Sequence, residues 1–134
     1  MGRHRAEAPS IEDFERIADE AFASLPAHFR EHCLGVVIRV EDFPDKEVMK
    51  TMGLNSPFDI LGLYHGRGEP YEPVNQITHY PDMIYLYRRP MLAYWSAYDD
   101  TLEEIVSHVL VHEIGHHFGL SDDDMHMIEG AQDD

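Results

Sequence analysis

Residues 108–126 read HVLVHEIGHHFGLSDDDMH and hold half of the chain's ten histidines. Three of them, His108, His112 and His116, are four residues apart, so on an α-helix they project from the same side. At 100° per residue, the apolar residues of this region fall on the remaining, broader side; they are Leu102, Val106, Val109, Leu110, Ile114 and Phe118. The pattern predicts a mostly buried helix that carries a stripe of histidines.

Both ends of this helix have sequence signals. Thr101 followed by Glu104 is typical of a capping box, in which the two side chains satisfy backbone N–H groups of the first turn. The helix should therefore begin near Leu102. Gly119 suits the left-handed conformation that ends many helices, and it lets the chain turn back beneath the helix end.

Within the helix, HEIGH has the H-E-x-x-H spacing of zinc hydrolases. Residues four apart are separated by about 6 Å along the axis, so His112 and His116 can bind one Zn²⁺ ion through Zn–N bonds of about 2.0–2.1 Å. Glu113 lies further round the helix, where it can reach a water on that ion and act as general base. The motif has a chance expectation of about 0.07 in this chain, and the Gly119 and Asp122 that follow lower it to roughly 0.0005.

A third zinc ligand should follow the helix. Asp122 is the leading candidate, because a carboxylate oxygen binds zinc at about 2.0–2.2 Å; its other expected role is to cap a following helix. His126 and Glu129 are the alternatives as third ligand. His108 and His117 are expected to line the cleft or to have structural roles rather than to bind the metal.

The rest of the chain predicts one helix and three strands before the histidine helix. Ser10 and Asp13 resemble a capping box, and apolar residues then recur at helical spacing until Pro26. Segments rich in β-branched and aromatic residues predict strands. The expected strands are Leu34 to Val40, FDILGLYHG at 58–66, and MIYLYRRP at 83–90, which Pro90 should end. One or two helical turns are expected at 46–52, and a short helix from Ser121.

HEIGHHFGLSDDDMHMIE, together with SPFDILGLYHG and PDMIYLYRRP, resembles the small bacterial zincin-like metallopeptidases, over residues 11–129. The resemblance implies an α+β fold of minimal zincin type. Such a fold has an N-terminal helix, a small mixed sheet of about three to four strands packed on the active-site helix, and a short C-terminal helix. It also implies a zinc ion and an H-E-x-x-H-x-x-G-x-x-D pattern, in which Ser can replace the final Asp.

Length and composition limit the expected domain organisation, partners and cellular compartment of the protein. With 134 residues, the chain should form a single domain over 10–130 behind a flexible tail of residues 1–9. A net charge of −16 argues against nucleic acid and anionic membranes as partners, and no apolar run is long enough to span a bilayer. The single cysteine, Cys33, should be a buried small hydrophobe and fits a reducing cytoplasm. A monomer or weak dimer is expected.

These features together predict a cytoplasmic zinc metallopeptidase. Glu113 would take a proton from water and deliver it to the leaving amine, and strand 83–89 would offer an edge to an extended peptide substrate. Two other functions are compatible with the same motif: a zinc-binding interaction module with little turnover, and a metallohydrolase of non-peptide amides. The candidates for stabilising an oxyanion are Tyr80, Tyr85, Tyr87 and Tyr94.

Overall fold

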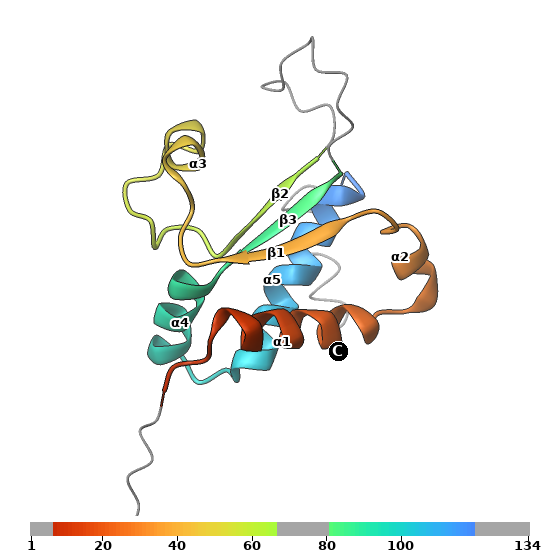
Figure 1. Ribbon diagram of the computed structural model, residues 1–134, viewed down its shortest axis with the longest axis horizontal. Coiled ribbons are helices and arrows are strands. Elements are labelled where there is room, and N and C mark those ends of the chain that lie inside the picture. Colours follow the sequence, from red (N-terminus) through yellow and green to blue (C-terminus); the bar gives the residue numbers. More distant parts are fainter. Residues whose placement is uncertain (1–6, 67–80, 120–134) are drawn as a thin grey trace, which may run out of the picture.

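The computed structural model describes residues 7–66 and 81–119, which form helices and a small sheet of the expected α+β class (Figure 1). In chain order the elements are α1 (Ile11–Ala23), α2 (Ala27–Glu31), β1 (Val37–Glu41), α3 (Lys46–Thr51), β2 (Gly62–His65), β3 (Met83–Tyr87), α4 (Arg88–Ala97) and α5 (Leu102–His117). None of these helices combines the length and the hydrophobicity that a membrane span requires.

The sheet has three strands in the order β1-β3-β2. β1 runs parallel to β3 and β2 runs antiparallel to it, which confirms the predicted small mixed sheet. β3 is the central strand, so the prediction that it offers an edge to a peptide is wrong: hydrogen bonds to β1 and β2 already occupy both of its sides. Among the described strands, β1 and β2 are the edges.

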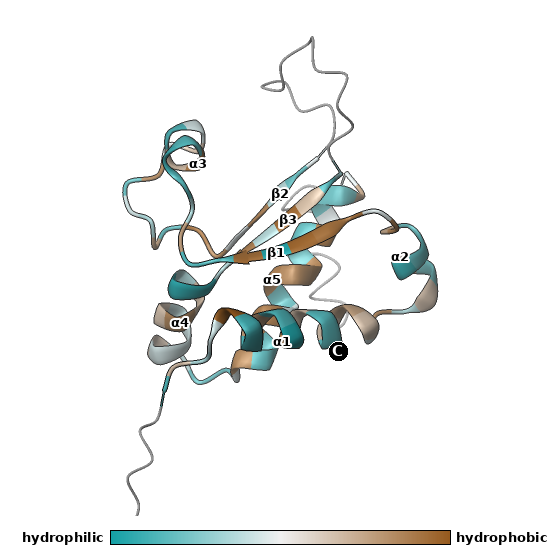
Figure 2. Ribbon diagram, in the orientation of Figure 1, coloured by the Kyte–Doolittle hydropathy of each residue, from teal (hydrophilic) through white to brown (hydrophobic). Residues whose placement is uncertain are grey.

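The two faces of the sheet differ in composition because side chains alternate along each strand. The inner face, directed toward α1 and α5, is mostly apolar; the side chains that define it are Ile38, Val40, Tyr64, Ile84 and Leu86, with Gly62. The outer face carries Glu41, Leu63, His65, Tyr85 and Tyr87. Figure 2 shows hydrophobic colouring on β1 and on the turns of α5 near the sheet, and mainly hydrophilic colouring on α3.

The core lies between the inner face and the two long helices. Phe14 of α1, Ile84 of β3 and Val106 and Leu110 of α5 are completely buried there. Each fully buried side chain of this size contributes roughly 1.5–3 kcal/mol. This packing fixes α5 against β2 and β3, and so fixes the place of the histidines that α5 carries.

The sequence signals at the helix ends are confirmed. Both capping boxes are present, Ser10 with Asp13 on α1 and Thr101 with Glu104 on α5. The helical part of α5 ends at His117, and Gly119 follows with a φ of 80°. That left-handed conformation is one that a glycine adopts without steric cost.

Several predicted boundaries are corrected, and the largest correction concerns Pro90. The expected third strand stops at Tyr87, and α4 begins at Arg88 with Pro90 in its first turn. A proline is tolerated there because the first N–H groups of a helix have no partner within it. Arg88 also holds this junction, donating through Nε to the carbonyl of Pro9 (2.7 Å) and pairing through Nη1 with Asp42 (3.0 Å).

The remaining differences are smaller. β1 starts at Val37 rather than Leu34, after Gly35 with a φ of 87°, and β2 keeps only four residues of the expected FDILGLYHG strand. α2 was not predicted, since Pro26 was expected only to end α1 and instead precedes a new helical turn. The expected helical turns at 46–52 are confirmed as α3.

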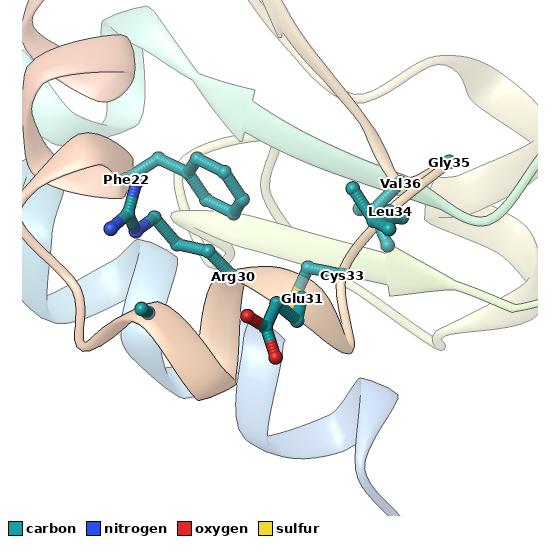
Figure 3. A pocket seen from close by; sticks show the side chains of 8 residues that line it. Phe22, Arg30, Glu31, Cys33, Leu34, Gly35 and Val36 are labelled. Carbon is teal, nitrogen blue, oxygen red and sulfur yellow. The ribbon is translucent and has the colours of Figure 1, made fainter.

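A hollow of about 500 Å³ lies beside α2, and none of the histidines of α5 lines it. Figure 3 shows Phe22 and Arg30 on one side of it and Leu34 and Val36 on the other. Cys33 is in its wall but only 3% exposed, and burial raises the pKa of its thiol. The cysteine is thus the buried small residue that was expected, because a thiol with a raised pKa is a poor nucleophile.

Candidate metal centre

The C-terminal half of α5 brings three potential ligands together. One ligand atom from each of His112, Glu113 and His116 lies within 4.8 Å of the others. The Nε2 atoms of His112 and His116 are 3.3 Å apart. Glu113 is only 8% exposed, and both histidines are partly buried. Burial of a carboxylate is costly unless its charge is paired or hydrogen-bonded, and Glu113 and the two imidazoles form a group that could hold a metal ion.

The spacing of the two imidazoles fits a zinc ion. Zn–N bonds of about 2.0–2.1 Å at a tetrahedral angle place two nitrogen ligands roughly 3.3–3.4 Å apart. The Nε2 atoms of His112 and His116 already have this separation. Two histidines and nearby carboxylates are also a donor set that zinc sites commonly use. The residues present therefore suit the metal that the motif implies.

Gly62 of β2 determines how closely α5 approaches the sheet. A Cβ at this position would lie 2.6 Å from Cγ1 of Val109 and 3.6 Å from Cγ of Glu113. Only a residue without a side chain allows this distance. Glu113 is thus held directly beneath β2, a relation that the sequence could not reveal because it depends on the register of β2 against the helix.

An open cleft runs along α5 beside these residues. A hollow of about 250 Å³ is bounded by Asp59, Gly62, His112 and Glu113 among others. A second hollow, of about 470 Å³, shares His108, Leu61 and Val109 with it and extends toward Tyr94 and Glu104. His108 borders both hollows, in the cleft-lining position expected for it. The sequence did not predict that residues 59–61, just before β2, line this cleft. Their position opposite the histidines follows only from the fold.

His117 links three parts of the fold through its two ring nitrogens. Its Nε2 is 2.9 Å from the carbonyl oxygen of His32, to which it donates. Nδ1 then accepts from the Tyr64 hydroxyl at 3.0 Å, a tautomer assigned from these partners. Nδ1 also lies 3.6 Å from a carboxylate oxygen of Asp82. Both ring nitrogens are engaged, which is the structural role expected for His117.

The tyrosine candidates are divided between the two faces of the sheet. Tyr85 and Tyr87 lie on the outer face, away from the cleft, so they are poorly placed to stabilise an oxyanion there. Tyr94 borders the second hollow. Other predictions lie outside the described residues; they concern Tyr80, the helix from Ser121, and the third-ligand candidates Asp122, His126 and Glu129.

The family of the chain follows from its sequence as a whole. No curated protein matches it. The family described as zincin-like metallopeptidase matches residues 33–131, which include the whole sheet and α5 with its histidines. The match covers most of the chain and agrees with the fold and with the His112–Glu113–His116 cluster, so this protein belongs to the zincin-like metallopeptidase family.

Proposed function

We propose that this protein is a zinc-dependent peptidase. His112 and His116 bind the metal through Nε2, Asp122 supplies the third ligand, and Glu113 is the general base. The observation that carries the proposal is the 3.3 Å separation of the two Nε2 atoms beside a buried glutamate. A site that only held a structural zinc ion would have no need of a buried carboxylate at that position.

Each side chain of the cluster has a distinct task in peptide hydrolysis. Bound zinc would polarise the substrate carbonyl and lower the pKa of an attacking water. Glu113 would accept the proton of that water on a carboxylate oxygen and later transfer it to the nitrogen of the leaving amine. The close approach of α5 to β2 at Gly62 supports this role, because it places the Cγ of Glu113 beside that strand.

The edge of β2 is the best place for an extended substrate. β2 is an edge strand of the described sheet, and its Gly62 lines the hollow next to His112 and Glu113. A peptide that pairs with this edge would gain backbone hydrogen bonds without requiring a deep pocket. Its scissile carbonyl would then lie beside the histidines of α5.

The test is the substitution Glu113→Gln. Glutamine nearly matches glutamate in volume but cannot accept the proton, so the variant should fold and bind zinc normally. Its hydrolysis of a peptide library should fall by at least about 100-fold, the lower end of what base catalysis contributes. Zinc content, circular dichroism and cleavage by mass spectrometry are to be measured on the same samples.

The matched control is Glu103→Gln, which removes the same charge from an exposed position in the first turn of α5. It should retain full activity. Equal activity of the Glu113→Gln variant and the wild type would rule out Glu113 as base. A zinc-loaded wild type that cleaves no peptide would favour either an interaction module or hydrolysis of non-peptide amides.

A further inference from the structure

A second pocket lies on the outer face of the sheet, on the side opposite α5. It is enclosed between α3 and the strands, with side chains from β1, β2 and β3 forming its floor. Its volume of about 240 Å³ is below the range of about 300–1,000 Å³ typical of sites for drug-sized ligands. A pocket of this size suits a single side chain or a similarly small group.

The lining of this pocket combines acidic and aromatic side chains with apolar ones, and it includes one histidine, His65. Glu41 comes from β1, Asp45 from the N-cap of α3 and Glu47 from its first turn, and Tyr85 and Tyr87 come from β3. The described residues that line it include no lysine or arginine. The two tyrosine rings are nearly parallel, at 4° with centroids 6.4 Å apart. Carboxylates around aromatic rings form a favourable environment for a cation.

Tyr87 provides an independent indication that something binds here. Its side chain is only 1% exposed, yet it lies outside the apolar core cluster and borders the pocket. Within the part of the chain that the structure describes, its hydroxyl has no hydrogen-bonding partner. An unsatisfied buried hydroxyl is costly, and a ligand with N–H donors would satisfy it.

The charges around Tyr87 define which ligand fits. Burial raises the pKa of the Tyr87 hydroxyl most, and the charges of Glu41 and Asp45 raise it further. Their negative potential therefore reaches the buried end of the pocket. Asp45 uses one carboxylate oxygen to cap α3, accepting from the Val48 N–H at 2.8 Å. Glu41 pairs with Arg39 at 3.3 Å, but the Arg39 side chain is 63% exposed, and such surface pairs contribute little.

We propose that this outer-face pocket binds the basic side chain of a peptide, a lysine or an arginine. The cationic head would lie between the carboxylates of Glu41 and Asp45 and donate to the Tyr87 hydroxyl, and its aliphatic part would contact Leu63 and Met52. The site is separate from the metal centre and does not depend on hydrolytic activity.

The experiment is a binding titration of the zinc-loaded full-length protein with three capped amino acids. N-acetyl-arginine amide and N-acetyl-lysine amide carry the charge, and N-acetyl-citrulline amide is the neutral analogue of arginine. We expect at least one of the cations to bind at least tenfold more tightly than the citrulline derivative, with chemical-shift changes at Leu63 and Tyr87. Tyr87→Phe and Glu41→Gln should each weaken binding about tenfold, as expected for loss of one hydrogen bond to a charged group.

Matched substitutions distinguish this pocket from general attraction to an acidic protein. Glu15→Gln on α1 removes an equal charge from an exposed position far from the pocket and should leave affinity unchanged. Arg39→Gln should strengthen binding only slightly, by at most about fivefold, because the exposed Arg39 competes weakly for Glu41. Arg16→Gln removes an arginine that is similarly exposed (60%) and also paired with an acid, and should have no effect. Equal binding of citrulline, absence of binding by both cations, or equal effects of the pocket and control variants would overturn the proposal.

Discussion

The same three strands form both faces of the sheet, but the buried polar side chains of the two faces differ in their hydrogen bonding. On the inner face, Ile84 and Leu86 of β3 are completely buried against the helices, and Tyr64 of β2 has a hydrogen-bonding partner in His117. On the outer face, Tyr87 is just as buried but its hydroxyl has no such partner among the described residues, and acidic side chains surround it. On the inner face the side chains are packed against the helices and the Tyr64 hydroxyl is hydrogen-bonded. The outer face, by contrast, is only partly covered by α3.

Burial alone therefore does not identify a structural residue. A buried group with every polar atom satisfied contributes to stability, whereas a buried polar group without a partner is expected to have another use. On this basis we assign a structural role to Tyr64 and His117, whereas Tyr87 is the group to which the proposed ligand would donate. The predictions below begin with the candidate metal site on α5 and then compare the two faces.

The largest effect is expected from removal of an imidazole at the metal centre. His112→Ala or His116→Ala should weaken zinc binding by more than about 100-fold, because even residues that only support a ligand typically contribute 10–100-fold. Zinc content after dialysis against a weak chelator measures this. His108→Ala removes an exposed histidine of the same helix and should retain zinc. Stoichiometric zinc in both His112 and His116 variants would place the metal elsewhere.

The next effect concerns the contact between α5 and β2. Gly62→Ala should lower the free energy of unfolding by about 1–3 kcal/mol, since its Cβ would overlap Cγ1 of Val109. Urea denaturation measures the change. A double-mutant cycle with Val109→Ala provides the control, because removing Cγ1 should recover about 1 kcal/mol in the Gly62→Ala background. Strictly additive effects would show that the helix and strand are not in tight contact there.

A smaller loss is expected on the inner face at Tyr64. Tyr64→Phe removes the hydroxyl that donates to Nδ1 of His117 and should lower the free energy of unfolding by about 1 kcal/mol, the typical net value of one hydrogen bond. Urea denaturation at neutral pH measures it. The ring and its packing are kept, so an unchanged stability would mean that this hydrogen bond does not help to fix α5.

Local sequence signals predicted the helices that carry the site better than they predicted the sheet. The capping pair of Thr101 and Glu104, the periodicity of α5 and the glycine after it depend on residues close in the chain, and the structure bears them out. The order of the strands depends on contacts distant in sequence, so the central position of β3 was missed.

The same limit applies to the surroundings of the candidate site. The spacing of His112 and His116 on one helix face is fixed by helix geometry alone, and was predictable. The approach of Gly62 to Glu113 required the register of β2, which the sequence pattern does not specify. The prediction that Pro90 ends a strand was wrong, because a proline can either follow a strand or lie in the first turn of a helix. The local sequence does not distinguish these two positions.

The smallest effect at neutral pH is expected from Tyr87→Phe, the outer-face counterpart of Tyr64→Phe. Because the hydroxyl of Tyr87 is buried without a hydrogen-bonding partner in the described structure, its removal should leave the free energy of unfolding unchanged or raise it by up to about 1 kcal/mol. Urea denaturation of the two variants side by side checks this. A loss at Tyr87 as large as that at Tyr64 would mean that the two faces do not differ as described.

Alkaline pH sharpens this last test. Burial, followed by the charges of Glu41, Asp45, Tyr85 and Glu113, raises the pKa of Tyr87 above its ordinary value of 10.0. The unfolded chain therefore releases the phenol proton at a lower pH than the folded chain does, and stability falls as pH rises above about 10. At pH 11 the wild type should have lost about 1.4 kcal/mol more than Tyr87→Phe, relative to pH 8. Parallel pH profiles of the two proteins would show that Tyr87 is not held neutral by its surroundings.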